Sequence, residues 1–164
     1  MIFGMTIQVF IHVVLSLVGL VAGFAAVFGL LSGERRDGWT AVFLASTVLT
    51  SATGFVLPAD KLLPSHIVGI ISLVVLAIAL LARYVRHLVG AWRWIYVVTA
   101  VIALYLNFFV FIAQAFLKVP ALKAAAPTGS EPPFLIAQGI ALVLFVLLGI
   151  GSVRRFKGLE VSAA

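Results

Sequence analysis

The stretch ALYLNFFVFIAQAF, residues 103–116, combines the apolar length of a membrane-spanning helix with two side-chain amides. Asn107 and Gln114 stand seven residues apart, two turns of an α-helix, so both amides lie on one face with Phe111 between them. Hydrocarbon offers amides no hydrogen-bond partner, so a helix face turned to lipid would not carry both. We therefore expect this stripe to face protein, water or a ligand.

The composition of the whole chain is that of an integral membrane protein. Of its 164 residues, 64% are hydrophobic and 10% are charged, and the mean hydropathy is +1.28. A soluble domain contains about 25% charged residues and about half apolar ones. The net charge of +6 comes from short basic clusters between apolar runs, a pattern typical of membrane topology and not of nucleic-acid binding. The chain has no cysteine, which excludes disulfides and thiolate ligands.

Five segments are apolar and long enough to cross a bilayer, which takes about 20 residues. The sequence therefore predicts an all-α fold, in which residues 1–164 form a single membrane domain built as a five-helix transmembrane bundle. The expected helices cover residues 5–32, 39–58, 65–86, 92–117 and 132–153. Most connections between them are short, so successive helices are expected to pack as antiparallel neighbours.

The distribution of Arg and Lys predicts the orientation of this bundle. Eight of the eleven basic residues lie at or near the ends of the expected helices on one side, namely Arg35, Arg36, Arg83, Arg86, Arg93, Arg154, Arg155 and Lys157. The other three, Lys61, Lys118 and Lys123, fall on the opposite side. The positive-inside rule then places the N-terminus outside and the C-terminus in the cytoplasm.

With this orientation, the strongest polar groups of every expected helix lie in its outer half. The inner half is almost entirely Leu, Val, Ala, Ile and Phe. Each polar residue taken alone has a structural explanation, an interhelical hydrogen bond worth about 0.6 to 2 kcal/mol. Taken together they predict a pocket open to the periplasm and lined by six residues, His12, Thr50, His66, Asn107, Gln114 and Gln138.

Two histidines in this set are expected to be neutral. His66 follows Ser65, a natural N-cap, and the positive end of the helix dipole disfavours imidazolium there. His12 lies deeper, where an unpaired charge in hydrocarbon is costly. Two neutral imidazoles on facing helices are what a bis-histidine haem b requires, so His12 and His66 are also candidate haem ligands. Zinc or copper is disfavoured, because the nearby sequence adds no acid or thiolate to these imidazoles.

Motifs of common enzymes are missing from the sequence. It contains no GxSxG, HExxH, P-loop or GxGxxG pattern, and no carboxylate lies inside an expected span. No catalytic residue is therefore predicted, and proton-coupled transport of the usual kind is disfavoured. Amides, hydroxyls and neutral imidazoles suit the binding of a polar headgroup, a quinone or a small solute.

Two segments carry a resemblance to other proteins. LLPSHIVGIISLVVLA, residues 62–77, and APTGSEPPF, residues 126–134, resemble segments of small, uncharacterised multi-pass inner-membrane proteins of proteobacterial type. The similarity covers most of the chain. It implies location in a bacterial inner (cytoplasmic) membrane, and it implies no activity, cofactor or site residue.

Three functions of different classes fit these features. The first is an accessory or binding protein whose periplasm-facing pocket holds a small ligand, a lipid or a quinone, which explains the outer polar positions with one cavity. The second is a membrane electron carrier that holds haem b through His12 and His66. The third is a channel or transporter subunit, acting as a homo-oligomer or in a larger membrane complex. The apolar inner half argues against the third function, because it offers no polar route to the cytoplasm.

Overall fold

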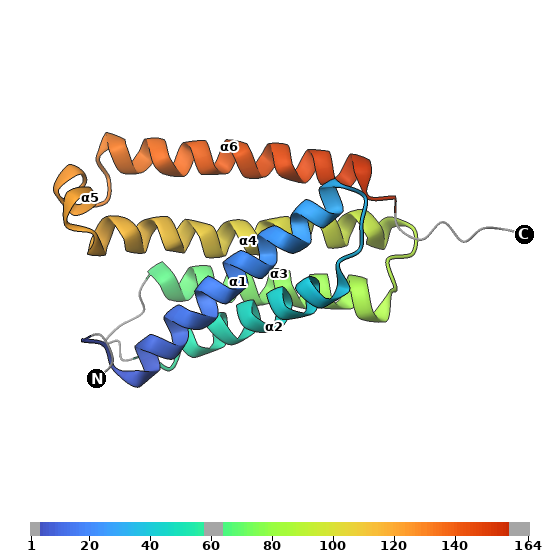
Figure 1. Ribbon diagram of the computed structural model, residues 1–164, viewed down its shortest axis with the longest axis horizontal. Helices are drawn as coiled ribbons and strands as arrows, with labels where there is room; N and C mark the ends of the chain where they lie inside the picture. Colours follow the sequence, from blue (N-terminus) through green and yellow to red (C-terminus); the bar gives the residue numbers. More distant parts are fainter. Residues whose placement is uncertain (1–3, 58–63, 158–164) are drawn as a thin grey trace, which may run out of the picture.

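The computed structural model is a bundle of helices that lie side by side (Figure 1). The structure describes residues 4–57 and 64–157, and within these ranges it contains helices and no β-strand, which confirms the all-α prediction. The elements are α1 (Ile7–Leu31), α2 (Asp37–Gly54), α3 (Pro64–Leu80), the π-helical turn η1 (Leu81–Val85), α4 (Ala91–Lys118), α5 (Pro120–Ala125) and α6 (Pro132–Arg155).

Four stretches of helix among the described residues are long and apolar enough to cross a membrane. They are α1, α3 with its continuation η1, α4 and α6, and they correspond to the first, third, fourth and fifth expected spans. α2 corresponds to the second expected span but is not among the four, since its 18 residues begin with Asp37 and include many Ser and Thr. The prediction of a multi-pass membrane protein is therefore supported by four helices, and the fifth span stays a prediction.

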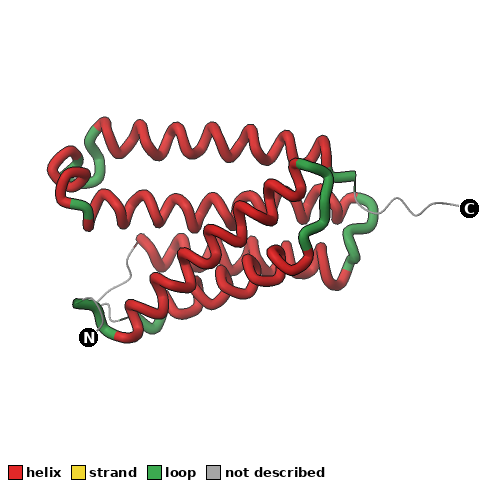
Figure 2. Tube along the Cα trace, in the orientation of Figure 1, coloured by secondary structure: helices red, strands yellow, loops and turns green. Residues whose placement is uncertain are grey.

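Successive long helices contact one another, as the short connections predict. α1 also contacts α4, so α1 to α4 form a four-helix unit, and α6 packs against α4 and α1 (Figure 1). Figure 2 shows that the α1–α2 and α3–α4 connections lie at one end and the turn containing α5 at the other. α6 lies at the periphery of the bundle, and only four of its 24 residues are buried.

Small residues on α1 set its distance from α2 and α4. Gly23 is buried, and a Cβ atom there would lie 2.5 Å from Cδ1 of Leu104 on α4 and 2.8 Å from Cδ2 of Phe43 on α2. One turn earlier, a Cβ atom at Gly19 would lie 3.0 Å from Oγ1 of Thr47 and 3.1 Å from Nδ2 of Asn107. The missing side chains allow the backbone of α1 to approach both neighbours closely.

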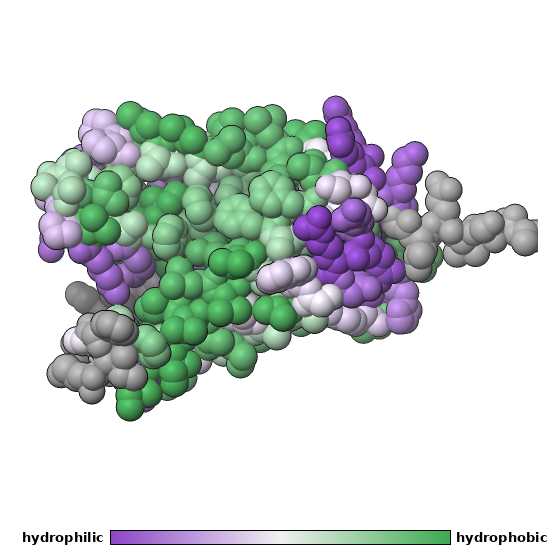
Figure 3. Space-filling view, viewed as in Figure 1, coloured by the Kyte–Doolittle hydropathy of each residue, from purple (hydrophilic) through white to green (hydrophobic). Residues whose placement is uncertain are grey.

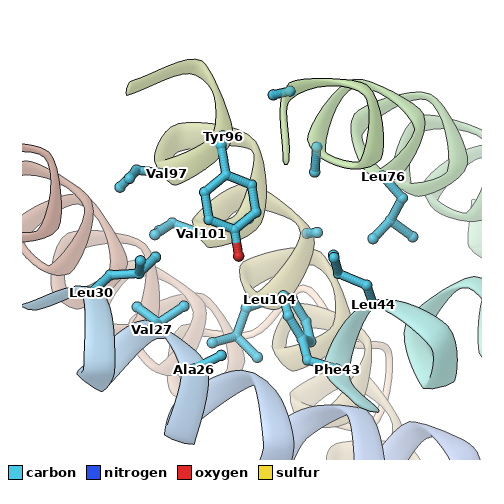
Figure 4. Packing of buried hydrophobic residues seen from close by; sticks show 14 of the residues in the cluster. Ala26, Val27, Leu30, Phe43, Leu44, Leu76, Tyr96, Val97, Val101 and Leu104 are labelled. Carbon is cyan, nitrogen blue, oxygen red and sulfur yellow. The ribbon is translucent and has the colours of Figure 1, made fainter. Parts of the chain in front are cut away.

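An apolar core closes the half of the bundle nearest the α1–α2 connection (Figure 4). Tyr96 of α4, Phe43 of α2 and Leu76 of α3 are completely buried, and Val27 of α1 is 1% exposed. Figure 4 shows side chains from these four helices gathered around the ring of Tyr96. The core consists mainly of Leu, Val, Ala and Phe, as expected for the apolar half of each helix.

The same end of the molecule carries most of the basic residues, and we call it the basic end (Figure 3). Arg83 is buried there, donates a hydrogen bond to the carboxylate of Asp37 and lies 5.3 Å from the ring centre of Tyr96. Arg93 donates to the carbonyl oxygen of Phe156, which fastens the start of α4 to the end of α6. Figure 3 shows this hydrophilic end beside a broad apolar surface, the arrangement expected of a membrane protein.

Residues 119–131 connect α4 to α6 at the opposite end, and they include the short helix α5. The carboxylate of Glu131 accepts hydrogen bonds from the N–H and hydroxyl of Thr128 and from the N–H of Ser130. Desolvation raises the pKa of Glu131, but these hydrogen bonds to the ionised form outweigh it and lower the pKa to about 2. The carboxylate is therefore ionised at neutral pH and orders the turn before α6.

The close approach of α1 at Gly23 can be tested by adding a side chain. Gly23→Val should lower the free energy of unfolding by about 1–3 kcal/mol, because Leu104 and Phe43 are completely buried and have no room to withdraw. The measurement is denaturation of the detergent-solubilised protein, with Gly139→Val as control, since nothing lies within 4 Å of a Cβ atom at Gly139. Equal stability of the two variants would contradict tight packing at Gly23.

Candidate functional site

A cavity of about 480 Å³ lies between α1, α2, α3 and α4. It is bordered by the first half of α1, the end of α2, the start of α3 and the second half of α4. Because these helices alternate in direction, the four segments meet at one end of the bundle, opposite the basic end. We call this space the outer cavity. Its volume is in the range of small-molecule sites.

Five of the six residues predicted to form a pocket line the outer cavity, namely His12, Thr50, His66, Asn107 and Gln114. Gln138 does not line it. The buried amide of Gln138 donates to the carbonyl oxygen of Phe109 at 3.1 Å and so joins α6 to α4. α6 packs against α4 and α1 and therefore lies outside the group of helices that encloses the cavity.

His12 is half-buried on α1 and faces α2. Its Nδ1 lies 3.0 Å from Oγ1 of Thr53, and the Thr53 hydroxyl itself donates to the carbonyl oxygen of Leu49 at 2.7 Å. Since the hydroxyl proton is used in that bond, the Thr53 oxygen accepts and Nδ1 of His12 carries a proton. In a neutral ring the other nitrogen, Nε2, then carries none and can act as an acceptor or a metal ligand.

Aromatic rings form part of the cavity wall. The ring of His66, near the start of α3, stacks on Phe55 with ring centres 5.6 Å apart and an interplanar angle of 27°. Phe111 of α4 also lines this space, and its ring stacks on that of Phe108 with ring centres 5.9 Å apart. Flat side chains from α3, α4 and the end of α2 thus border one cavity.

The two amides that share a face of α4 have different surroundings. Asn107 is 7% exposed, and it accepts from the Ser16 hydroxyl at 2.9 Å and donates to the Ser16 carbonyl oxygen at 3.2 Å. These two bonds join α4 to α1. Gln114 lies two turns farther from the basic end, and its side chain is exposed at the edge of the cavity. Both amides therefore border the cavity, and Asn107 is in addition hydrogen-bonded to α1.

Hydroxyl groups of α2 complete the polar lining. Thr50 donates to the carbonyl oxygen of Ser46 at 2.8 Å, and Ser51 donates to the Ser72 hydroxyl at 3.2 Å, which joins α2 to α3. Thr47 also lines the cavity and is 1% exposed, yet its Oγ1 has no hydrogen-bond partner among the described residues. Sequence reasoning did not select Ser16, Thr47, Ser51 or Ser72 as site residues, because serine and threonine in apolar helices usually bond to their own backbone.

The cavity is nearly free of formal charge. Lys118, in the last turn of α4, is the one charged side chain in its described lining, and it suits the negative end of that helix dipole. Among the described residues, no group of three or more His, Cys, Asp or Glu side chains is placed to hold a metal ion. The available chemistry is hydrogen bonding to a neutral polar group within mainly apolar walls.

A second space of about 400 Å³ lies between α4 and α6. Aliphatic side chains and the rings of Tyr105 and Phe145 line most of it, and Arg154 borders it at the basic end. None of the six predicted site residues lies there. Comparison of the chain with protein-family models, curated proteins and solved structures gives no match. The functional argument therefore depends on the outer cavity and its lining.

Access to the outer cavity can be tested at Gln114. In the detergent-solubilised protein Gln114→Cys should react with a hydrophilic thiol reagent, because this position is exposed at the cavity edge, and the wild-type chain has no cysteine to interfere. Lys123→Cys is the reactive control on the same side, and Thr99→Cys, buried in α4, is the unreactive one. Reaction of Lys123→Cys without reaction of Gln114→Cys would show that the cavity is closed to water.

Proposed function

We propose that this protein is a binding protein of a bacterial inner membrane, and that the outer cavity holds a small membrane-soluble ligand with a neutral polar head, such as a quinone or a lipid. One observation carries the proposal: polar residues that lie far apart in the sequence, on four helices, line one cavity with apolar walls. Separate interhelical hydrogen bonds would not require these residues to share a cavity of ligand size.

The proposal includes five membrane spans with the N-terminus in the periplasm. An 18-residue helix such as α2 is about 27 Å long, close to the hydrocarbon thickness of about 30 Å. Its Ser and Thr side chains lower its hydropathy, but Ser46, Thr50 and Thr53 each donate to a carbonyl oxygen four residues earlier. Such hydroxyls are satisfied within their own helix and are compatible with an apolar environment. The basic end then faces the cytoplasm.

The apolar core favours binding over conduction through a single chain. Tyr96, Phe43, Leu76 and Leu104 are completely buried and fill the bundle between the outer cavity and the basic end. Thr40 and Arg83 are buried in that half, but neither of them lines the outer cavity, which does not extend through the apolar core. A channel or transporter role would therefore need a route between copies or with another subunit.

Filling the outer cavity should abolish ligand binding. Gly54 lines the cavity, and a Cβ atom there would lie 3.5 Å from Cε1 of His12, an ordinary van der Waals contact. The side chain of Gly54→Trp can therefore begin without a clash, and its ring then fills the space that the ligand would occupy. A short-chain benzoquinone at 100 times its Kd should stabilise the wild-type protein by about 2.7 kcal/mol. The stabilisation should disappear in Gly54→Trp.

The matched control is Gly139→Trp on α6, where the surface is exposed and nothing lies within 4 Å of a Cβ atom. This variant should keep the full response, measured as the shift in thermal unfolding of detergent-solubilised protein. An identical shift in both tryptophan variants would place the ligand outside the outer cavity. No shift with quinones or lipids in the wild type would contradict the proposed function.

Haem b is the second candidate ligand, favoured by the presence of His12 and His66 on the same cavity. The hydrogen bond from Nδ1 of His12 to Thr53 orients the ring in the way that iron-ligating histidines usually require. A haem protein should show a Soret band in oxidised and dithionite-reduced spectra, and His12→Ala and His66→Ala should each remove it. A purified protein without this band would eliminate haem and leave the first candidate.

A further inference from the structure

The space between α4 and α6 is a groove with a buried floor and an open side. Its floor includes Val101 of α4 and Phe145 of α6, each 6% exposed. Its rim includes Ile102, Val146 and Ile150, which are 38%, 52% and 46% exposed. Both helices are long and apolar enough to cross a membrane, so in a bilayer the groove opens to hydrocarbon and not to water. We call it the lateral groove.

Hydrogen bonds join the two helices beyond both ends of the lateral groove. Gln138, one turn before the first lining residue of α6, donates to the carbonyl oxygen of Phe109 on α4. At the basic end, Arg93 of α4 donates to the carbonyl oxygen of Phe156, which follows the last residue of α6. None of these four residues lines the groove. The fold therefore fixes the separation of the helices at both ends and leaves room between them.

The length and lining of the lateral groove suit a hydrocarbon chain. On α6 the lining runs from Leu142 to Arg154, twelve residues or about 18 Å along the helix axis. One leaflet of a bilayer has about 15 Å of hydrocarbon, half of the total of about 30 Å. Apart from Tyr105 and Arg154, the lining consists of apolar residues. An acyl chain that crosses one leaflet therefore has about the length of the groove and finds apolar walls along it.

Arg154 places a cation where the lateral groove reaches the basic end. Its side chain is exposed, and it forms no ion pair with another residue of the described ranges. The described carboxylates at this end, those of Glu34 and Asp37, pair with other arginines. An arginine at the end of a membrane-spanning helix extends towards the lipid headgroups, and its guanidinium can donate two parallel hydrogen bonds to a phosphate.

We propose that the lateral groove binds one acyl chain of an anionic phospholipid from the leaflet at the basic end, with the lipid phosphate at Arg154. The apolar walls take the chain, and the guanidinium takes the charge of the headgroup. A zwitterionic phospholipid carries its own cation beside the phosphate and therefore gains less from Arg154. This site goes beyond the proposed function, because the lateral groove and the outer cavity share no lining residue.

The headgroup is tested with two phospholipids that have the same acyl chains, dimyristoyl phosphatidylglycerol, which is anionic, and dimyristoyl phosphatidylcholine, which is zwitterionic. Native mass spectrometry of the detergent-solubilised protein measures the affinity for each. The wild type should bind the anionic lipid about fivefold more tightly, the contribution of one basic side chain near anionic lipid. Arg154→Gln should abolish this preference and leave phosphatidylcholine binding unchanged. Arg155→Gln is the matched control, because Arg155 is also exposed but does not line the groove.

The acyl chain is tested by filling the lateral groove. Gly149 lines it, and a Cβ atom there would lie 3.5 Å from Cγ1 of Val101, an ordinary van der Waals contact. The ring of Gly149→Phe should therefore occupy the groove and weaken the binding of both phospholipids by the same factor. Gly139→Phe, on the same helix but outside the lining, should bind both like the wild type. Val146→Trp, at the exposed rim, replaces Gly149→Phe if that variant does not fold.

Several outcomes would overturn the proposed lipid site. Equal affinity of the wild type for the two phospholipids, or the same loss of preference in Arg154→Gln and Arg155→Gln, would show that Arg154 does not bind the phosphate. Undiminished binding by Gly149→Phe would place the chain elsewhere. A dimer that Gly149→Phe dissociates would assign the groove to a second copy of this chain. Gly54→Trp fills the outer cavity and should bind both phospholipids like the wild type, whereas loss of binding there would place the lipid in the outer cavity.

Discussion

The close approach of α1 to α2 and α4 is the contact on which the rest of the structure depends. Gly19 and Gly23 stand one turn apart on the same face of α1, and neither position has room for a side chain without movement of its neighbours. Gly23 meets Leu104 and Phe43 in the apolar core, whereas Gly19 meets Thr47 and Asn107 beside the cavity. One stripe of small residues therefore holds together both the sealed half and the open half of the bundle.

The polar residues of the open half have two roles at once. Ser16 with Asn107 joins α1 to α4, His12 with Thr53 joins α1 to α2, and Ser51 with Ser72 joins α2 to α3. In hydrocarbon these groups have no water to bond, so pairing between helices stabilises the bundle. Every residue of these pairs except Thr53 borders the cavity, which means that its polar lining is oriented by the fold before any ligand arrives. Such preorganisation lowers the cost of ordering side chains upon binding.

The sequence was sufficient for the positions of the long helices and for five of the polar residues that line the outer cavity, because both depend on local properties. Apolar length locates a helix, and distance along the helix gives the depth of a residue. Depth grouped His12, Thr50, His66, Asn107 and Gln114 at one level, and all five line the outer cavity, whereas their role in ligand binding stays a prediction. Depth does not give direction or neighbours, and Gln138 shows the consequence. It lies on α6, outside the four helices that enclose the cavity, and its side chain donates to the carbonyl oxygen of Phe109 on α4. Thr47 was not selected because its distinguishing feature is a missing backbone bond, which depends on packing around its rotamer.

An unpaired hydroxyl is not by itself evidence of a site. Ser152 is completely buried near the basic end, and its Oγ also has no hydrogen-bond partner among the described residues. It lines neither of the two cavities, so no ligand bound in them would reach it. Thr47 borders the outer cavity, but its Oγ1 is itself buried and has no hydrogen-bond partner among the described residues. A Cβ atom at Gly19 would lie 3.0 Å from this oxygen and 3.1 Å from Nδ2 of Asn107, so the backbone of α1 occupies the space beside both groups. The missing bond at Thr47 is therefore explained by the close approach of α1, the same contact that joins the two halves of the bundle.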